Sequence, residues 1–75
     1  MMLTLSLRKL VDGQEMDIMV DGEQRIDYTL KVLMESGFLS GDKWAVRSLR
    51  TKERIDAKRS YRENNIYNGD ILTIE

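Results

Sequence analysis

The chain has 75 residues, with 12 Lys or Arg against 13 Asp or Glu, and it contains neither Cys nor His. A chain of this length has room for one core, so we expect a single domain over residues 1–75. The missing Cys and His exclude disulfides, iron–sulfur clusters, Cys/His zinc sites and His-based acid–base catalysis. No apolar run reaches the about 18 residues of a membrane span, and no leader pattern opens the chain, so we expect a cytoplasmic protein without membrane insertion.

Two alternating stretches, residues 3–10 and 15–20, predict a β-hairpin. Apolar and polar side chains alternate in both, which is the pattern of strands with one buried face. The inward residues are Leu3, Leu5, Leu7, Met16, Ile18 and Val20. Asp12-Gly13 lies in the connection between them, which we expect to be a loop of three to five residues. Met19 falls on the outer face.

Residues 26–36 predict a short helix. The apolar residues at helical spacing are Ile26, Leu30, Leu33 and Met34. Asp27 is the expected N-cap, because its carboxylate could accept from first-turn amides at the positive end of the helix dipole. Gly37 fits the left-handed position after the helix end. A helix of about ten residues is marginal alone, so its apolar stripe is expected to pack on the sheet.

Residues 43–49 predict a third strand, after the turn signal of residues 40–42, Ser-Gly-Asp. Each face of this strand has a polar member, so its orientation is ambiguous. We favour Trp44 and Val46 inward, over the alternative in which the face of Ala45 is buried. Trp44 is then expected in the core or at its border, and the alternative is an exposed interaction role.

The last third of the chain predicts a turn-rich approach to a terminal strand. Residues 54–56 form at most a short strand with Ile55 as its inward anchor, and residues 60–63 have the Ser-x-x-Glu order of a capping box. Residues 68–70, Asn-Gly-Asp, then reverse the chain into the apolar strand 71–74. Such a strand would aggregate as a free edge, so we expect it between two others, parallel to the first strand.

Four short motifs carry a family resemblance: Asp17-Ile18, Gln24-Arg25-Ile26, Leu30-Lys31-Val32-Leu33 and Ile66-Tyr67-Asn68-Gly69-Asp70-Ile71-Leu72. Together with residues 60–74, which resemble the capped turn, buried isoleucine and last strand of ubiquitin, they make the chain similar to the ubiquitin-like β-grasp fold. More narrowly, the chain resembles the YukD-like ubiquitin-fold proteins that accompany bacterial type VII (Esx-type) secretion systems.

The resemblance implies an α+β fold, a mixed four- to five-stranded sheet with one helix packed across one face. It also implies a non-catalytic cytoplasmic accessory component, whose partners are proteins that include membrane-bound secretion components. No cofactor and no small-molecule substrate are implied. The sequence ends Ile74-Glu75 without a Gly-Gly pair, so we expect neither conjugation nor sulfur transfer. The apolar recognition patch of ubiquitin would fall near Arg47 and Thr73, so we do not expect a ubiquitin-receptor type of contact.

Positive charge is concentrated in residues 43–62, which hold eight basic and two acidic residues, a net charge of +6, while the remainder carries −7. Guanidinium and ammonium groups in such a segment suit carboxylates or phosphates on a partner. The predicted partner-binding residues are Lys43, Arg47, Arg50, Lys52, Arg54, Lys58 and Arg59. Two alternatives are a solvated strand edge and a binder of nucleic acid or anionic surfaces. Nucleic acid is disfavoured because Tyr61 and Tyr67 are expected to pack in or border the core.

Other kinds of site are weaker. The acidic residues along the hairpin and the loop after it are Asp12, Glu15, Asp17, Asp21 and Glu23. They lack the spacing of a calcium-binding loop, so we expect no metal site. No Ser, Thr or Lys has a recognisable base partner, so we expect no enzyme. A third way of binding, in which an edge strand extends a partner's sheet, also remains open.

Overall fold

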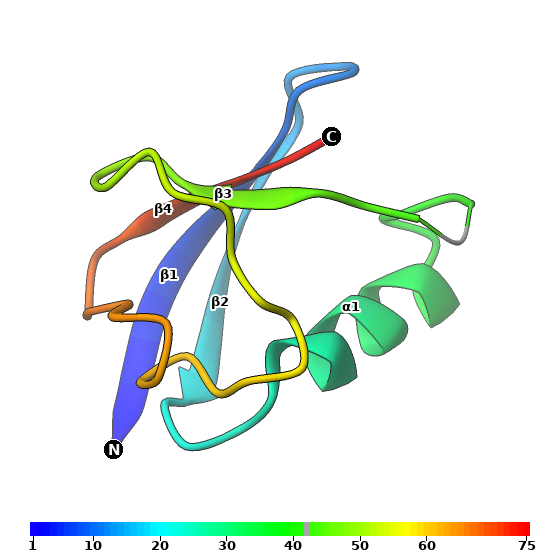
Figure 1. Ribbon diagram of the computed structural model, residues 1–75. Helices are drawn as coiled ribbons and strands as arrows, with labels where there is room; N and C mark the ends of the chain where they lie inside the picture. Colours follow the sequence, from blue (N-terminus) through cyan, green and yellow to red (C-terminus); the bar gives the residue numbers. More distant parts are fainter. Residues whose placement is uncertain (42) are drawn as a thin grey trace.

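The structure is a computed structural model that describes residues 1–41 and 43–75. Its elements are β1 (Met2–Lys9), β2 (Glu15–Asp21), α1 (Ile26–Glu35), β3 (Val46–Ser48) and β4 (Ile71–Ile74). They form a four-stranded sheet in the order β2-β1-β4-β3, with α1 lying across one face (Figure 1). The expected mixed sheet with one helix is therefore confirmed. Asp42, which we placed in the turn before the third strand, lies outside the described residues.

The terminal strand lies inside the sheet, as predicted. β4 runs parallel to β1, with Leu72 beside Leu7, and antiparallel to β3, with Thr73 opposite Arg47. β1 and β2 form the predicted antiparallel hairpin. Because β4 has a neighbour on both sides, its backbone does not form an exposed edge.

The hairpin loop has the predicted length. The Lys9 amide donates to the Gln14 carbonyl (2.8 Å), which leaves four residues between them. Gly13 adopts a φ of 73° and donates to the Lys9 carbonyl (2.9 Å). A positive φ of this kind favours glycine, which explains why Gly13 occupies the loop. Leu10 and Val11 are exposed in the loop.

The start of α1 differs from the prediction. Arg25, and not Asp27, holds the N-cap position, and the Arg25 side chain makes no capping hydrogen bond. The Ile26 amide donates instead to the Arg59 carbonyl (3.1 Å), and the Asp27 amide to the Ala57 carbonyl (2.8 Å). The Asp27 carboxylate pairs with the Arg25 guanidinium. The N-cap prediction was wrong because carbonyls from a distant segment satisfy these amides, which a local sequence pattern cannot reveal.

The end of α1 follows the prediction. Gly37 has a φ of 87°, its amide donates to the Met34 carbonyl (3.1 Å), and the Phe38 amide donates to the Leu33 carbonyl (3.0 Å). This pair of bonds is the Schellman motif, which satisfies carbonyls that the helix would otherwise leave open. Leu39 then turns back into the core.

The core lies between α1 and the sheet. It consists of Leu3, Leu5, Leu7, Val20, Ile26, Leu30, Leu33, Leu39, Val46, Ile55, Tyr61, Ile66, Leu72 and Ile74. Tyr61 is completely buried, and its hydroxyl donates to Thr29 Oγ1 (2.7 Å). The predicted inward stripe of the hairpin faces this core, with Met16 and Ile18 only partly buried. Ile26, Leu30 and Leu33 of the helix are buried as expected, whereas Met34 is exposed.

The third strand has the predicted orientation but is shorter than residues 43–49. Val46 and Ser48 are buried, and Trp44 packs against the core. Pairing continues beyond β3, because Ala45 exchanges two backbone hydrogen bonds with Glu75 (2.9 and 3.0 Å).

Residues 54–56 contribute one isolated bridge, between Arg54 and Arg47, rather than a fifth strand. Ile55 is buried as expected. The capping box is confirmed, because the Ser60 amide donates to Glu63 Oε1 and the Glu63 amide donates to Ser60 Oγ, both at 3.0 Å. These contacts hold the turn that leads to β4.

Candidate functional site

Three of the seven predicted partner-binding residues form ion pairs within the chain. The pairs are Arg47–Glu75 (3.7 Å), Arg50–Asp70 (3.0 Å) and Arg59–Asp56 (3.5 Å). Their charge is therefore partly neutralised before any partner arrives. The other four predicted residues have no such pair with a described residue.

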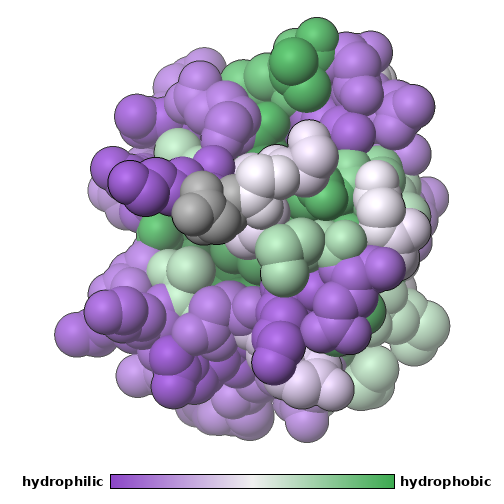
Figure 2. Space-filling view, turned by 90° about the vertical axis from the view of Figure 1, so that its right-hand side faces the viewer, coloured by the Kyte–Doolittle hydropathy of each residue, from purple (hydrophilic) through white to green (hydrophobic). Residues whose placement is uncertain are grey.

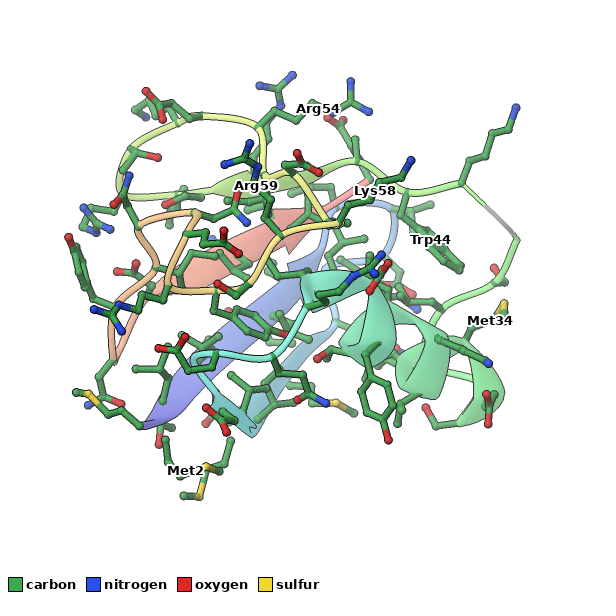
Figure 3. The ribbon with its side chains drawn as sticks, turned by 60° about the horizontal axis from the view of Figure 1, so that its bottom comes forward. Met2, Met34, Trp44, Arg54, Lys58 and Arg59 are labelled. Atoms are coloured by element: carbon green, nitrogen blue, oxygen red, sulfur yellow. The ribbon has the colours of Figure 1, made fainter. Side chains whose placement is uncertain are left out.

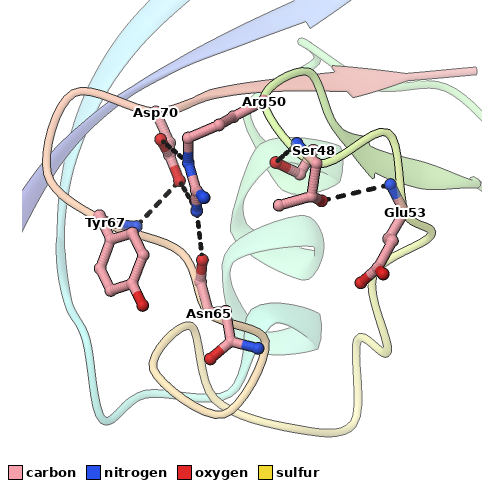
Figure 4. Close-up of polar contacts among 7 residues, drawn as sticks. Ser48, Arg50, Glu53, Asn65, Tyr67 and Asp70 are labelled. Atoms are coloured by element: carbon pink, nitrogen blue, oxygen red, sulfur yellow. Dashed lines mark hydrogen bonds and ion pairs between the residues drawn. The ribbon is translucent and has the colours of Figure 1, made fainter.

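Arg50 links the turn after β3 to the turn before β4 (Figure 4). Its guanidinium donates to both carboxylate oxygens of Asp70 (3.0 Å each) and to the Asn65 carbonyl, and it lies over the Tyr67 ring, 4.7 Å from the centroid. These hydrogen bonds from Arg50, followed by the Tyr67 amide, hold the pKa of Asp70 below its ordinary value, against the opposing effect of burial. Tyr67 is 59% exposed, so its expected place in or beside the core was wrong.

Most basic side chains pair with acidic ones in the described part of the chain, and four of the other five gather in one place. Seven of the twelve pair with an acidic side chain of a described residue. Within residues 1–41 and 43–75, the five without an ion-pair partner are Lys31, Lys43, Lys52, Arg54 and Lys58. All of these except Lys52 line a single groove.

This groove, which we call the Trp44 groove, lies between α1 and residues 54–58. It consists of two open hollows of about 590 and 500 Å³ that share Trp44 and Arg54. The residues that line it are Asp27, Leu30, Lys31, Met34, Lys43, Trp44, Val46, Arg54, Ile55, Asp56, Ala57 and Lys58. Figure 2 shows apolar atoms between hydrophilic ones in the middle of this side of the molecule. In the view of Figure 3, Trp44 lies between Lys58 and Met34.

Trp44 occupies the middle of the groove in a fixed orientation. Its indole Nε1–H donates to the Ser40 carbonyl (3.0 Å), and the ring packs partly against the core. The part of the ring that stays exposed, together with the exposed side chain of Met34, presents apolar surface to solvent. A large aromatic side chain that is already fixed in position can offer a partner a large contact area while losing little conformational entropy on binding.

The two carboxylates that line the groove among residues 1–41 and 43–75 are already engaged. Asp27 pairs with Arg25, while Asp56 pairs with Arg59 and accepts the Lys58 amide (3.0 Å). These two acidic side chains therefore form ion pairs with arginines outside the groove and not with its basic residues. An anionic group on a partner could pair with these cations at little electrostatic cost.

The sequence pointed to part of this groove. Lys43, Arg54 and Lys58 belong to the predicted set, whereas Lys52 lies away from the groove. Lys31 was missed because it lies outside the basic segment and reaches the groove from α1. Lys31 directly follows the buried Leu30, which places it at the border of the apolar face of α1. This position becomes informative only when it is known which segment of the chain lies beside that border.

The same architecture occurs in solved structures. A de novo design based on ubiquitin superposes with a TM-score of 0.80 at 18% identity, covering 99% of this chain and 87% of that chain. Ubiquitin from Caldiarchaeum subterraneum superposes with a TM-score of 0.79 at 9% identity, covering 99% and 91%. The fold is ubiquitin-like. The expected β-grasp class is thus confirmed, and these low identities concern the fold alone. No protein-family model and no curated protein matches the sequence.

In the described part of this ubiquitin-like chain, no group of three or more acidic residues is placed to hold a metal ion. Two acidic residues of the hairpin pair with basic neighbours, Glu15 with Arg8 (3.0 Å) and Asp12 with Lys9 (3.1 Å), and Asp17 accepts from the Ser6 hydroxyl (2.7 Å). Within residues 1–41 and 43–75, no helix has the length and apolar character needed to span a bilayer.

Proposed function

We propose that this chain is a non-catalytic protein-interaction module that binds its partner through the Trp44 groove. The observation that carries the proposal is the gathering of Lys31, Lys43, Arg54 and Lys58 around one partly apolar groove. Unpaired positive charge beside exposed apolar surface is complementary to a protein surface that offers carboxylates around an apolar contact.

The lining of the groove supports binding rather than catalysis. The described residues that line it include no Ser, Thr or Tyr, and their two carboxylates, Asp27 and Asp56, pair with arginines. Nucleophilic or acid–base catalysis requires a reactive group with a partner that activates it. Lysines and arginines around a tryptophan do not form such a pair.

We further propose that the module, one ubiquitin-like domain over residues 1–75, is a cytoplasmic accessory component of a type VII secretion system. The support is the resemblance of its short motifs to the YukD-like proteins. One of these motifs, Leu30-Lys31-Val32-Leu33, contributes Leu30 and Lys31 to the groove. The partner is then a protein of the secretion machine, such as its ATPase or a membrane subunit.

The test is an affinity pull-down from nuclease-treated cytoplasm and solubilised membranes of the native cell. The double variant Arg54→Glu/Lys58→Glu reverses charge at the groove, and Lys52→Glu reverses an unpaired charge away from it. We expect the wild type and Lys52→Glu to recover a secretion ATPase or membrane subunit that the double variant loses. Equal recovery by all three proteins would show that the groove is not the binding site, and recovery of nucleic acid alone would favour a polyanion binder.

A further inference from the structure

We infer that the Trp44 groove takes an acidic peptide segment with one bulky apolar side chain, an inference that rests on the proposed function and names the partner's chemistry. The segment places the apolar side chain against Trp44 and its carboxylates against the surrounding cations. The inference follows from the arrangement of charge and apolar surface in the two hollows.

The apolar contact comes from the floor of the groove. Trp44 is shared by both hollows, and Met34 borders one of them with 40% of its surface exposed. Burying apolar surface favours binding in proportion to the area removed from water. Tryptophan is enriched among the residues that dominate binding energy, and methionine adapts to irregular partners. One leucine- or phenylalanine-sized side chain suits a contact of this kind.

The charges surround this contact on several sides. Lys31 and Lys43 border the hollow next to α1, Lys58 borders the other, and Arg54 belongs to both. A guanidinium binds a carboxylate through two parallel hydrogen bonds, and lysines act as mobile point charges. A segment with Asp or Glu on both sides of its apolar residue therefore meets a cation in each direction.

The same features favour a peptide over a nucleic acid. Single-stranded nucleic acids bind along grooves where several aromatic side chains stack on successive bases. The lining of this groove contains one aromatic side chain, Trp44, beside aliphatic ones such as Ile55 and Ala57. Burial of an apolar side chain against Trp44 would stabilise the complex, and a phosphate backbone offers no such side chain.

The groove is also held in shape before binding. The Ser40 carbonyl fixes the indole of Trp44 (3.0 Å). One wall of the groove is α1, and the other is the loop that contains residues 54–58. The first two amides of α1 donate to the carbonyls of Ala57 (2.8 Å) and Arg59 (3.1 Å) in this loop, which connects the two walls. A preformed site loses less conformational entropy on binding, which raises affinity for a short segment.

Trp44 provides a direct readout, because it is the single tryptophan of the chain. The probe is a short synthetic peptide with one central Leu flanked by Asp and Glu, titrated at low salt while tryptophan fluorescence is recorded. Three comparison ligands are the same peptide with Ala at the centre, the same peptide with Lys in place of each acid, and oligothymidylate. We expect saturable binding of the first peptide, roughly tenfold weaker binding of the Ala peptide, and none of the Lys peptide.

Variants assign the binding to the groove. We expect Lys31→Glu and Met34→Ser to weaken the Leu peptide, and Lys52→Glu to leave its affinity unchanged. Circular dichroism of each variant controls for loss of fold. No fluorescence change up to millimolar Leu peptide, equal affinity for the Leu and Ala peptides, or binding of oligothymidylate as tight as that of the Leu peptide would overturn the inference.

The two proposals fail differently. If the pull-down depends on Arg54 and Lys58 but the Leu peptide does not bind, the interaction module stands and the acidic segment is wrong. If the Leu peptide binds in a manner that depends on Lys31, while all pull-down proteins recover the same partner, the groove binds such segments but is not the site for that partner.

Discussion

Arg50 and Asp70 form a bidentate ion pair that connects two turns on neighbouring strands, with Nε and Nη2 each 3.0 Å from a carboxylate oxygen. Asp70 is only 8% exposed, so its charge depends on this partner and on the Tyr67 amide (2.9 Å). The pair explains why a charged residue occupies the buried position just before the terminal strand.

The pair predicts a pH dependence of stability. The pKa of Asp70 is lowered in the fold, chiefly by the hydrogen bonds from Arg50. Its ionised form therefore stabilises the protein above the unfolded value of about 3.9, and this contribution is lost as the pH falls through the folded pKa. Arg50→Met should lower the free energy of unfolding in urea at pH 7, and the difference from the wild type should shrink at about pH 2.

Arg47→Met is the matched control, because Arg47 pairs with Glu75 at 3.7 Å between side chains that are about half exposed. Exposed pairs contribute little to stability. A loss at pH 7 as large for Arg47→Met as for Arg50→Met would contradict a special role for the Asp70 pair.

Tyr61 should be sensitive to removal of a single oxygen. Its ring is completely buried, and its hydroxyl donates to Thr29 Oγ1 (2.7 Å). Tyr61→Phe keeps the packing and should cost about 1 kcal/mol, whereas Tyr61→Ala should cost about 3–5 kcal/mol. Chemical denaturation measures both changes. Equal costs would mean that packing of the ring contributes little.

Burial also raises the pKa of Tyr61, against the opposing hydrogen bond with Thr29. The folded state thus disfavours the phenolate, so stability should fall as the pH rises above about 10, the ordinary tyrosine value. Urea denaturation at rising pH measures this fall, which Tyr61→Phe should reduce. An identical alkaline loss in Tyr61→Phe would assign the effect to another group.

The capping box should contribute measurably to stability. Ser60→Ala removes the acceptor of the Glu63 amide and should cost about 1 kcal/mol. The pKa of Glu63 is lowered by the Ser60 amide and then by the Ser60 hydroxyl, so the variant should also raise it. An NMR titration of the Glu63 carboxyl checks this shift. Glu63→Gln keeps an acceptor for the Ser60 amide, so we expect it to cost less stability than Ser60→Ala. A larger loss in Glu63→Gln would contradict this expectation.

Gly37 tests the helix end. Its φ is 87°, and a Cβ at this position would meet nothing within 4 Å, so the cost of Gly37→Ala is conformational. We expect a loss of about 1 kcal/mol, and a smaller loss for Gly37→Asn because asparagine tolerates the left-handed region. Thermal melts rank the three proteins. A greater loss with Asn than with Ala would contradict the backbone explanation.

The sequence predicted the features that depend on neighbouring residues. Alternation placed Leu3, Leu5 and Leu7 on the buried face, and Gly37 marked the helix end, because each signal lies within one element. The need to cover an apolar terminal strand placed β4 between β1 and β3.

Features that depend on distant contacts were not predictable in this way. The amides at the start of α1 find carbonyls 30 or more residues away, so Asp27 was chosen as N-cap from its residue type alone. Counting charges found the basic segment but not the pairing of Arg50 with Asp70, 20 residues away. It also missed Lys31, which the fold brings beside Lys43 and Arg54.

The unusual cap of α1 makes the two walls of the Trp44 groove mechanically dependent on each other. The amides of Ile26 and Asp27 can exchange with solvent only when the bonds to Arg59 and Ala57 open, which separates the loop from the helix. Deuterium uptake at these two amides therefore measures how often the groove parts. A ligand that spans both walls should slow this uptake, even though it touches neither amide.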